Sequence, residues 1–223
     1  MSRIDYVDSK VGSTHFLDLL GDERSVLIIG GGPTTLEIDR FKDIKADCKV
    51  STSTCYLNNS LHKIGLTHHI VSVQTDFASN EFRTFYHENP LMKFIVEPNH
   101  LWKAPTGYKD VLRPGNYSTI TIQKEFRVGI VSRAILAYII SGFRDIYFVG
   151  FDGYSKDGKA QHAFLKNKTE LDPSATVNTY EKIYKNFEEF FEFVEDLRTD
   201  YEFNLVNLGA GHPSNIPTTL GYK

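Results

Sequence analysis

The chain has 223 residues, of which 41% are hydrophobic, with 25 Lys+Arg against 28 Asp+Glu. This balance is typical of a globular protein, and the net charge of -3 argues against a general nucleic-acid partner. The two cysteines, Cys48 and Cys55, supply neither a disulfide framework nor a zinc site. No segment approaches the ~20 apolar residues of a membrane span, and the first residues lack the apolar stretch of a signal peptide. We therefore expect a cytoplasmic protein with no integral membrane segment.

Short apolar runs that stop at turn residues alternate along the chain with stretches of helical spacing. Such runs are typical of buried parallel strands, and they occur at 26–29, 69–73, 93–96, 146–149 and 203–206. Apolar residues at helical spacing predict one helix at about 131–141, ended by Gly142, and a second at about 180–197. The alternation predicts an α/β fold.

We expect residues 1–223 to form a single Rossmann-like domain, with a mostly parallel sheet flanked by helices. Residues 98–129 break the alternation, because they contain three prolines and the only tryptophan. We interpret them as a small lid or insertion within the domain, whose alternating stretch at 117–122 predicts an edge strand.

The first candidate site is the turn Gly30-Gly-Gly-Pro-Thr-Thr35, which follows the first strand. Glycines let a backbone approach a ligand closely, and a helix that begins near Thr34 would favour a phosphate at its N-terminus. Pro33 suits a first helical turn. The pattern matches neither the dinucleotide fingerprint nor the P-loop, so a tight turn without a ligand is the equal alternative.

Two further candidate segments also follow predicted strands. Asp152 and Tyr154 come directly after the strand at 146–149, and His162 follows a few residues later. Ligands of open α/β sheets bind at the carboxyl ends of the strands, where a carboxylate can accept hydrogen bonds from a nucleotide. The third segment, 207–215, follows the last strand and is rich in small polar residues. Taken alone, a turn cap, a surface histidine and a terminal loop explain the three features better than a ligand site does.

Several chemical signatures are absent from the sequence. It contains no Asp-x-Asp pair, no GxSxG nucleophile turn and no HExxH. His68 and His69 are adjacent, so on a strand they would point to opposite faces of the sheet. The sequence therefore predicts no metal site, no cofactor and a metal-independent reaction.

Two blocks of the sequence resemble bacterial family-42 sialyltransferases. Leu27-Ile-Ile-Gly-Gly-Gly-Pro-Thr-Thr-Leu-Glu-Ile-Asp39 is similar to the opening strand and G-x-G-P-S turn of these enzymes. Ser141-Gly-Phe-Arg-Asp-Ile-Tyr-Phe-Val-Gly-Phe-Asp-Gly-Tyr154 is similar to their second signature, G-x-D-x-Y. Motility-accessory flagellin glycosyltransferases and 6-hydroxymethylpterin diphosphokinases resemble the chain more distantly.

The resemblance implies a site for a cytidine monophosphate (CMP) sugar. It assigns phosphate and nucleotide contacts to residues of both blocks. These are Gly30, Gly31, Gly32 and Thr34 in the first block, and Asp152 and Tyr154 in the second. It also assigns a contact to Thr54, which would follow the second strand of the family. The sequence departs from the family where Gly31 and Thr54 replace asparagines and where 173–179 lacks the histidine that serves as the general base. His162, His212 and Asp152 are the groups available to act as that base. His162 is our first choice, since histidine titrates near neutrality, and Asp152 is the second catalytic candidate.

Three functions follow from these observations. The first is a metal-independent glycosyltransferase of surface-glycan biosynthesis that takes a sugar from a nucleotide, with CMP favoured, to a glycan acceptor. The second is a nucleotide-sugar-binding accessory protein without catalysis, and the third is a pterin pyrophosphokinase-like transferase. A homo-oligomer is left open, because Phe82, Phe85 and Tyr86 could face either a partner subunit or a core.

Overall fold

A parallel sheet organises the chain in the computed structural model, which describes residues 18, 20–22, 24–71, 79–96, 112, 115–120, 128–152 and 177–210. In these residues the sheet has seven strands, namely β1 (Ser25–Ile29), β2 (Cys48–Thr52), β3 (His68–Val71), β4 (Lys93–Val96), β5 (Tyr117–Thr119), β6 (Asp145–Val149) and β7 (Asn204–Asn207). Their order is β5-β4-β3-β2-β1-β6-β7, and every pairing is parallel. The predicted α/β, Rossmann-like fold class is confirmed, and the described sheet is entirely parallel.

The direction of strand addition reverses at β1. The chain adds β2 to β5 on one side of β1 and then returns to place β6 and β7 on the other side. The switch point of the sheet therefore lies between β1 and β6, which pair in register from Ser25↔Asp145 to Ile29↔Val149. In open α/β sheets this is the position at which ligands bind, beyond the carboxyl ends of the strands.

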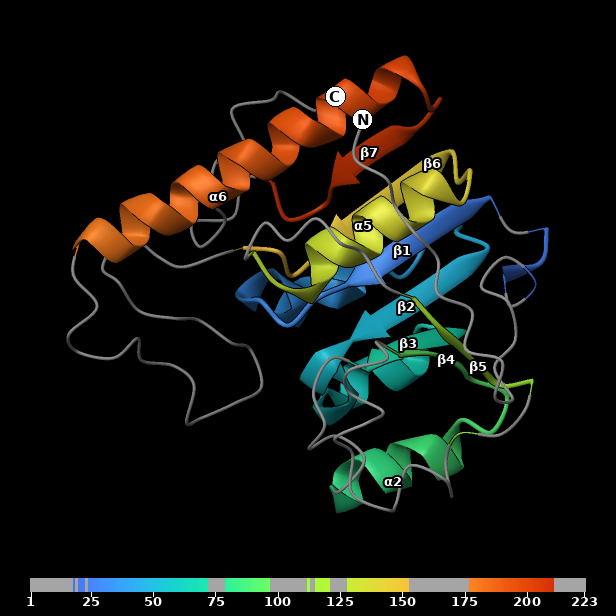
Figure 1. The fold of residues 1–223 in the computed structure, drawn as a ribbon. Coiled ribbons are helices and arrows are strands. Elements are labelled where there is room, and N and C mark those ends of the chain that lie inside the picture. The colour runs from blue at the N-terminus through green and yellow to red at the C-terminus, as the bar shows by residue number, and fades with distance from the viewer. Residues whose placement is uncertain are drawn as a thin grey trace.

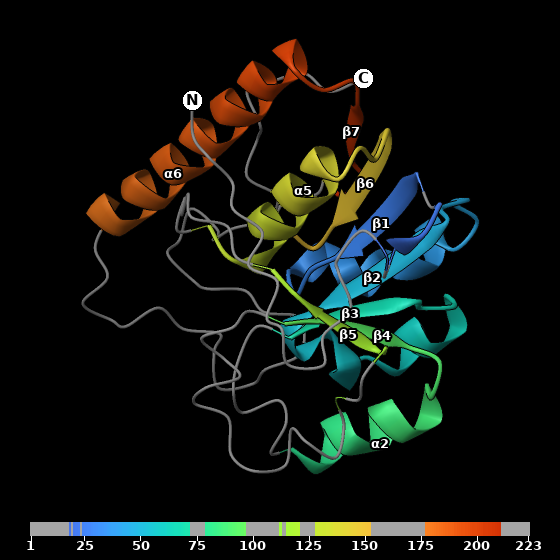
Figure 2. The ribbon, with the colours of Figure 1, turned by 45° about the vertical axis from the view of Figure 1, so that its right-hand side comes forward.

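Helices cover both faces of the sheet. The described helices are η1 (Pro33–Phe41), η2 (Ser53–Leu57), η3 (Asn59–Lys63), α2 (Asn80–Glu88), α5 (Ile130–Ile140), α6 (Val177–Asp196) and η5 (Leu197–Thr199). α5 and α6 lie side by side on one face, over β1, β6 and β7, whereas α2 lies on the opposite side near β3 and β4 (Figures 1 and 2). None of the helices in the described ranges is long and apolar enough to cross a membrane.

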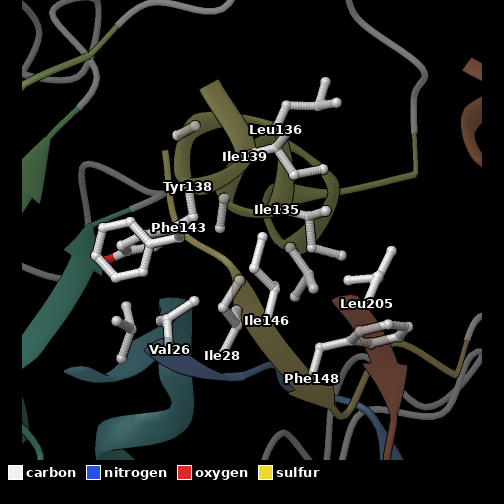
Figure 3. Close-up of a cluster of buried hydrophobic side chains, with 14 of the residues drawn as sticks. Val26, Ile28, Ile135, Leu136, Tyr138, Ile139, Phe143, Ile146, Phe148 and Leu205 are labelled. Atoms are coloured by element: carbon white, nitrogen blue, oxygen red, sulfur yellow. The ribbon is translucent and has the colours of Figure 1, made fainter. Parts of the chain in front are cut away.

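The apolar residues of β1 and β6 divide between the two faces. Val26, Ile28 and Ile146 pack against α5 (Figure 3), whereas Leu27 and Ile29 pack on the other face with residues of η1 and η3. This division follows from the alternation of side chains along a strand. Both strands are buried on two sides, which explains why their sequences are continuous apolar runs.

The connection from α5 to β6 is the helix end that the sequence predicts. Gly142 has φ +84°, its N–H donates to Ile139 O at 3.0 Å, and Phe143 N donates to Tyr138 O at 3.1 Å. This is a Schellman motif, completed by the Tyr138 and Phe143 rings with centroids 4.8 Å apart. The motif turns the chain directly into β6 and so sets where β6 begins.

Most predicted elements match the structure to within a residue or two. The strand predicted at 69–73 is His68–Val71, and the one predicted at 203–206 is Asn204–Asn207. The apolar pattern did not predict β2, because Lys49, Ser51 and Thr52 interrupt it, although the family resemblance implied a strand before Thr54. The predicted edge strand is confirmed as β5, at the end of the sheet, while most of the proposed lid at 98–129 lies outside the described residues.

The aromatic residues of α2 face the protein's own core. Phe82, Phe85 and Tyr86 are 0%, 2% and 6% exposed and pack with the strands β3 and β4. Ser79 caps this helix, because its hydroxyl accepts from Phe82 N at 2.9 Å. These aromatic side chains are core residues of the chain and not a surface for a partner subunit.

Candidate functional site

The carboxyl ends of β1 and β6 meet at the switch point and are joined by backbone hydrogen bonds. Gly30 N donates to Val149 O at 2.8 Å, and Gly32 N donates to Gly150 O at 2.9 Å. The glycine turn after β1 and the turn after β6 are 118 residues apart in sequence, yet they form one structure. Two of the three predicted segments are therefore brought together.

Close backbone approach explains why glycines occupy this junction. A Cβ at Gly30 would collide with Gly150 O and would lie 2.7 Å from Val131 Cγ2 on α5. Gly150 has φ +73°, and a Cβ there would collide with the Thr35 hydroxyl. Side chains are excluded at both positions, so this part of the glycine pattern is a requirement of packing.

Thr34 and Asp152 form the centre of the site. Asp152 Oδ2 accepts a hydrogen bond from Thr34 N and another from Thr34 Oγ1, both at 2.9 Å. The same hydroxyl oxygen accepts from Gly150 N at 2.8 Å. Both side chains are 1% exposed, so the contact is buried.

Pro33 begins a helix after the glycine turn, as predicted, but the helix is of the 3₁₀ type. Its N-cap, Gly32, offers no side chain, and the Asp152 carboxylate approaches from β6 to accept from Thr34 N. Thr35 extends the junction inward, because its hydroxyl donates to Gly30 O at 2.6 Å.

β2 contributes a third side to the junction. Thr52 Oγ1 donates to Ile29 O at 3.1 Å, and Cys55 Sγ donates to Gly30 O at 3.0 Å. Thr54, which the family resemblance assigns to the nucleotide, lies on η2 between these two residues and is 9% exposed. Ser53, at the start of η2, has φ +52°, a left-handed conformation that is strained for a residue with a side chain.

The turn after β7 lies against Thr34, at the junction of the turns after β1 and β6. A Cβ at Gly209 would lie 2.9 Å from Thr34 Oγ1 and 3.0 Å from Thr34 Cγ2. Leu208 N donates to Phe148 O at 2.9 Å, which ties this turn to β6. The described part of the third predicted segment, up to Ala210, therefore belongs to the junction.

Some predicted site residues cannot be placed. Tyr154 and His162 lie outside the described residues, as do the histidine at 212 and the segment 173–176. Gly31 is partly exposed at the tip of the turn. In the described ranges, no group of three or more His, Cys, Asp or Glu side chains could hold a metal ion.

Cys55 was not predicted as part of the site. It follows β2, which the apolar pattern did not reveal, and the family resemblance assigned the neighbouring Thr54 and not Cys55. Its thiol reaches Gly30 O because β2 pairs with β1, with Ile29 beside Ser51, and because η2 follows β2 directly.

The comparisons with known proteins identify the fold. The structure of the monofunctional α-2,3-sialyltransferase Cst-I from Campylobacter jejuni matches with a TM-score of 0.55 and 12% identity, over 96% of this chain and 85% of that one. The structure of the sialyltransferase CstII from the same organism, in complex with cytidine-5'-monophosphate, matches with a TM-score of 0.50 and 15% identity, over 89% and 86% of the two chains. The chain shares the fold of bacterial sialyltransferases. No family model and no curated protein matches the sequence.

Proposed function

We propose that the protein is a glycosyltransferase that transfers a sugar from a CMP-activated donor to a glycan acceptor in surface-glycan biosynthesis. The observation that carries the proposal is the junction of the turns after β1 and β6 at the switch point. The resemblance to family-42 sialyltransferases rests on these same two blocks of sequence. The fold shared with Cst-I and CstII, the second solved with cytidine-5'-monophosphate, supports it further.

The proposed reaction needs one proton acceptor and one leaving phosphate. His162 takes the proton of the acceptor hydroxyl, the hydroxyl oxygen forms a bond to the anomeric carbon, and the bond from that carbon to the phosphate oxygen breaks. CMP leaves with the electron pair. Polar groups at the carboxyl ends of the strands would stabilise the charge that develops on the departing phosphate.

Nucleotide titration tests the binding step. We expect CMP to bind measurably by calorimetry, and to bind more tightly than UMP, GMP or AMP. If none of the four nucleotides binds, the proposal is wrong. Consumption of ATP that depends on magnesium would instead favour the pterin pyrophosphokinase-like function.

Release of CMP from CMP-sialic acid in the presence of a glycan acceptor tests the chemical step. We expect His162→Ala to lower kcat by about 10²-fold or more, since general-base catalysis contributes about 10²–10⁴-fold. CMP affinity should stay within about threefold of the wild type. His87→Ala is the matched control, because His87 is an exposed histidine on α2. CMP binding without turnover of any sugar donor would favour the accessory protein.

A further inference from the structure

Four backbone donors of the glycine turn are used within the protein. Gly30 N and Gly32 N bond to carbonyls at the end of β6, and Thr35 N bonds to Gly32 O at 3.1 Å. Thr34 N and the Thr34 hydroxyl both donate to Asp152. A phosphate could bind to these groups only by breaking bonds that are already made.

The Asp152 carboxylate occupies the place of an anion at the start of η1. A helix N-terminus favours negative charge, and a carboxylate oxygen that accepts from the backbone there is the usual cap. Capping side chains usually come from the residue just before the helix, which here is Gly32. This cap comes instead from a residue 118 positions later, in the turn after the neighbouring strand β6.

The surrounding glycines fit this carboxylate closely. A Cβ at Gly32 would collide with Asp152 Oδ2 and would lie 2.8 Å from Gly150 O. A Cβ at Gly209 would crowd the Thr34 side chain at 2.9–3.1 Å. Glycine at these two positions allows the Thr34–Asp152 contact to form and to be enclosed.

We propose that Asp152 is a positioning residue, which holds Thr34 and thereby fixes the glycine turn, and that the donor phosphate is bound by other groups. This inference deepens the proposed function and rests on it for the identity of the ligand. The carboxylate repels a phosphate that binds nearby, so its negative charge is not needed for affinity. Its geometry is needed, because it sets the conformation of the turn against which the nucleotide would bind.

Three variants separate geometry from charge. In Asp152→Asn the amide oxygen can still accept from Thr34 N and Oγ1, but the charge is gone. Asp152→Ala removes the acceptor, and Thr34→Ser retains both donors. Asp145→Asn is the matched control, because Asp145 lies at the opposite end of the same strand.

Hydrogen exchange of the amides of residues 34–36, measured without nucleotide, tests the positioning role by itself. We expect Asp152→Ala to accelerate exchange of the Thr34 amide about tenfold or more, because its acceptor is lost. Asp152→Asn, Thr34→Ser and Asp145→Asn should stay within about threefold of the wild type. Unchanged exchange in Asp152→Ala would refute the inference.

Calorimetric titration with CMP tests the role in binding. We expect Asp152→Asn to bind CMP as tightly as the wild type or more tightly, and Asp152→Ala to bind about tenfold more weakly, or about 1.4 kcal/mol. If Asp152→Asn loses tenfold in affinity while Thr34 exchange is unchanged, Asp152 contacts the ligand and the inference is wrong. If the wild type does not bind CMP, the proposed function fails, and exchange still decides the positioning role. If Asp152→Ala does not fold, the CMP affinity of Asp152→Asn decides the inference, and a tenfold loss overturns it.

Discussion

Replacement of His69 should remove a large part of the protein's sensitivity to mild acid. His69 is fully buried on β3 and lies among the rings of Tyr56, Phe82, Phe85 and Phe94, at centroid distances of 5.5–6.3 Å. Its Nδ1 shares a hydrogen bond of 2.8 Å with Ser51 Oγ, and its Nε2 has no hydrogen-bond partner among the described residues. A protonated ring would need an acceptor at both nitrogens, which this environment does not provide.

Burial lowers the pKa of His69 from 6.5 to about 3 in the folded protein. The unfolded chain therefore binds a proton below about pH 6.5 that the folded protein does not bind until about pH 3, so stability falls as the pH falls through this window. Between about pH 7.5 and about pH 5 the two pKa values correspond to a loss of about 2 kcal/mol from this one residue. At about pH 3 the loss approaches about 4 kcal/mol.

Urea unfolding of the wild type and of His69→Gln, at about pH 7.5 and about pH 5, measures how much stability each protein loses between the two pH values. The glutamine variant will be less stable than the wild type, but its loss between the two pH values should be smaller by about 2 kcal/mol. His69→Phe serves if the glutamine variant does not fold, and His87→Gln, on the exposed face of α2, should leave the loss unchanged. Equal losses in the wild type and in both His69 variants would show that His69 is not the buried neutral group described here.

Three further substitutions test the turns. Gly150→Ala should destabilise the protein by about 3 kcal/mol or more, because its Cβ collides with neighbouring atoms, whereas Gly65→Ala, with the same φ of +73° but open space around it, should cost only about 1–2 kcal/mol. Equal costs in urea unfolding would contradict the packing explanation. Ser53→Gly should stabilise the protein by about 1 kcal/mol, since it relieves a left-handed conformation, and a lower melting temperature would argue against strain there. Asp47→Ala should cost about 1 kcal/mol, because Asp47 Oδ2 accepts three hydrogen bonds from the start of β1, and an unchanged urea midpoint would show that water replaces it fully.

Much of the site could be predicted because it lies at the ends of strands. The runs at 26–29 and 146–149 are uniformly apolar, so both read as buried parallel strands, and the glycines and polar residues that follow them fall at one edge of the sheet. Parallel strands end on the same side, which places Thr34 and Asp152 near each other in any sheet where β1 and β6 pair. The adjacency of His68 and His69 likewise predicted that they point to opposite faces. In the structure His68 contacts Cys48 and His69 contacts Ser51.

The rest required the tertiary structure. Nothing in the local sequence indicates that β6 pairs with β1 and not with β5, and this choice creates the switch point. The apolar pattern did not indicate β2, and the resemblance that implied a strand before Thr54 did not include Cys55, so its thiol was not expected beside the glycine turn.

The sequence by itself determined the α/β alternation, the position of the turns and the residue types at the strand ends, because these depend on periodicity and on local backbone preference. Only the tertiary structure shows which contacts the turns after β1 and β6 make with each other. From spacing alone, the glycines after β1 fitted a phosphate site and a tight turn without a ligand equally, and the family resemblance implied that Asp152 contacts a nucleotide. In the folded chain the Asp152 carboxylate bonds to Thr34, and the glycines leave room for that contact. A hydrogen bond between residues 118 positions apart depends on strand order and register, which no local pattern encodes.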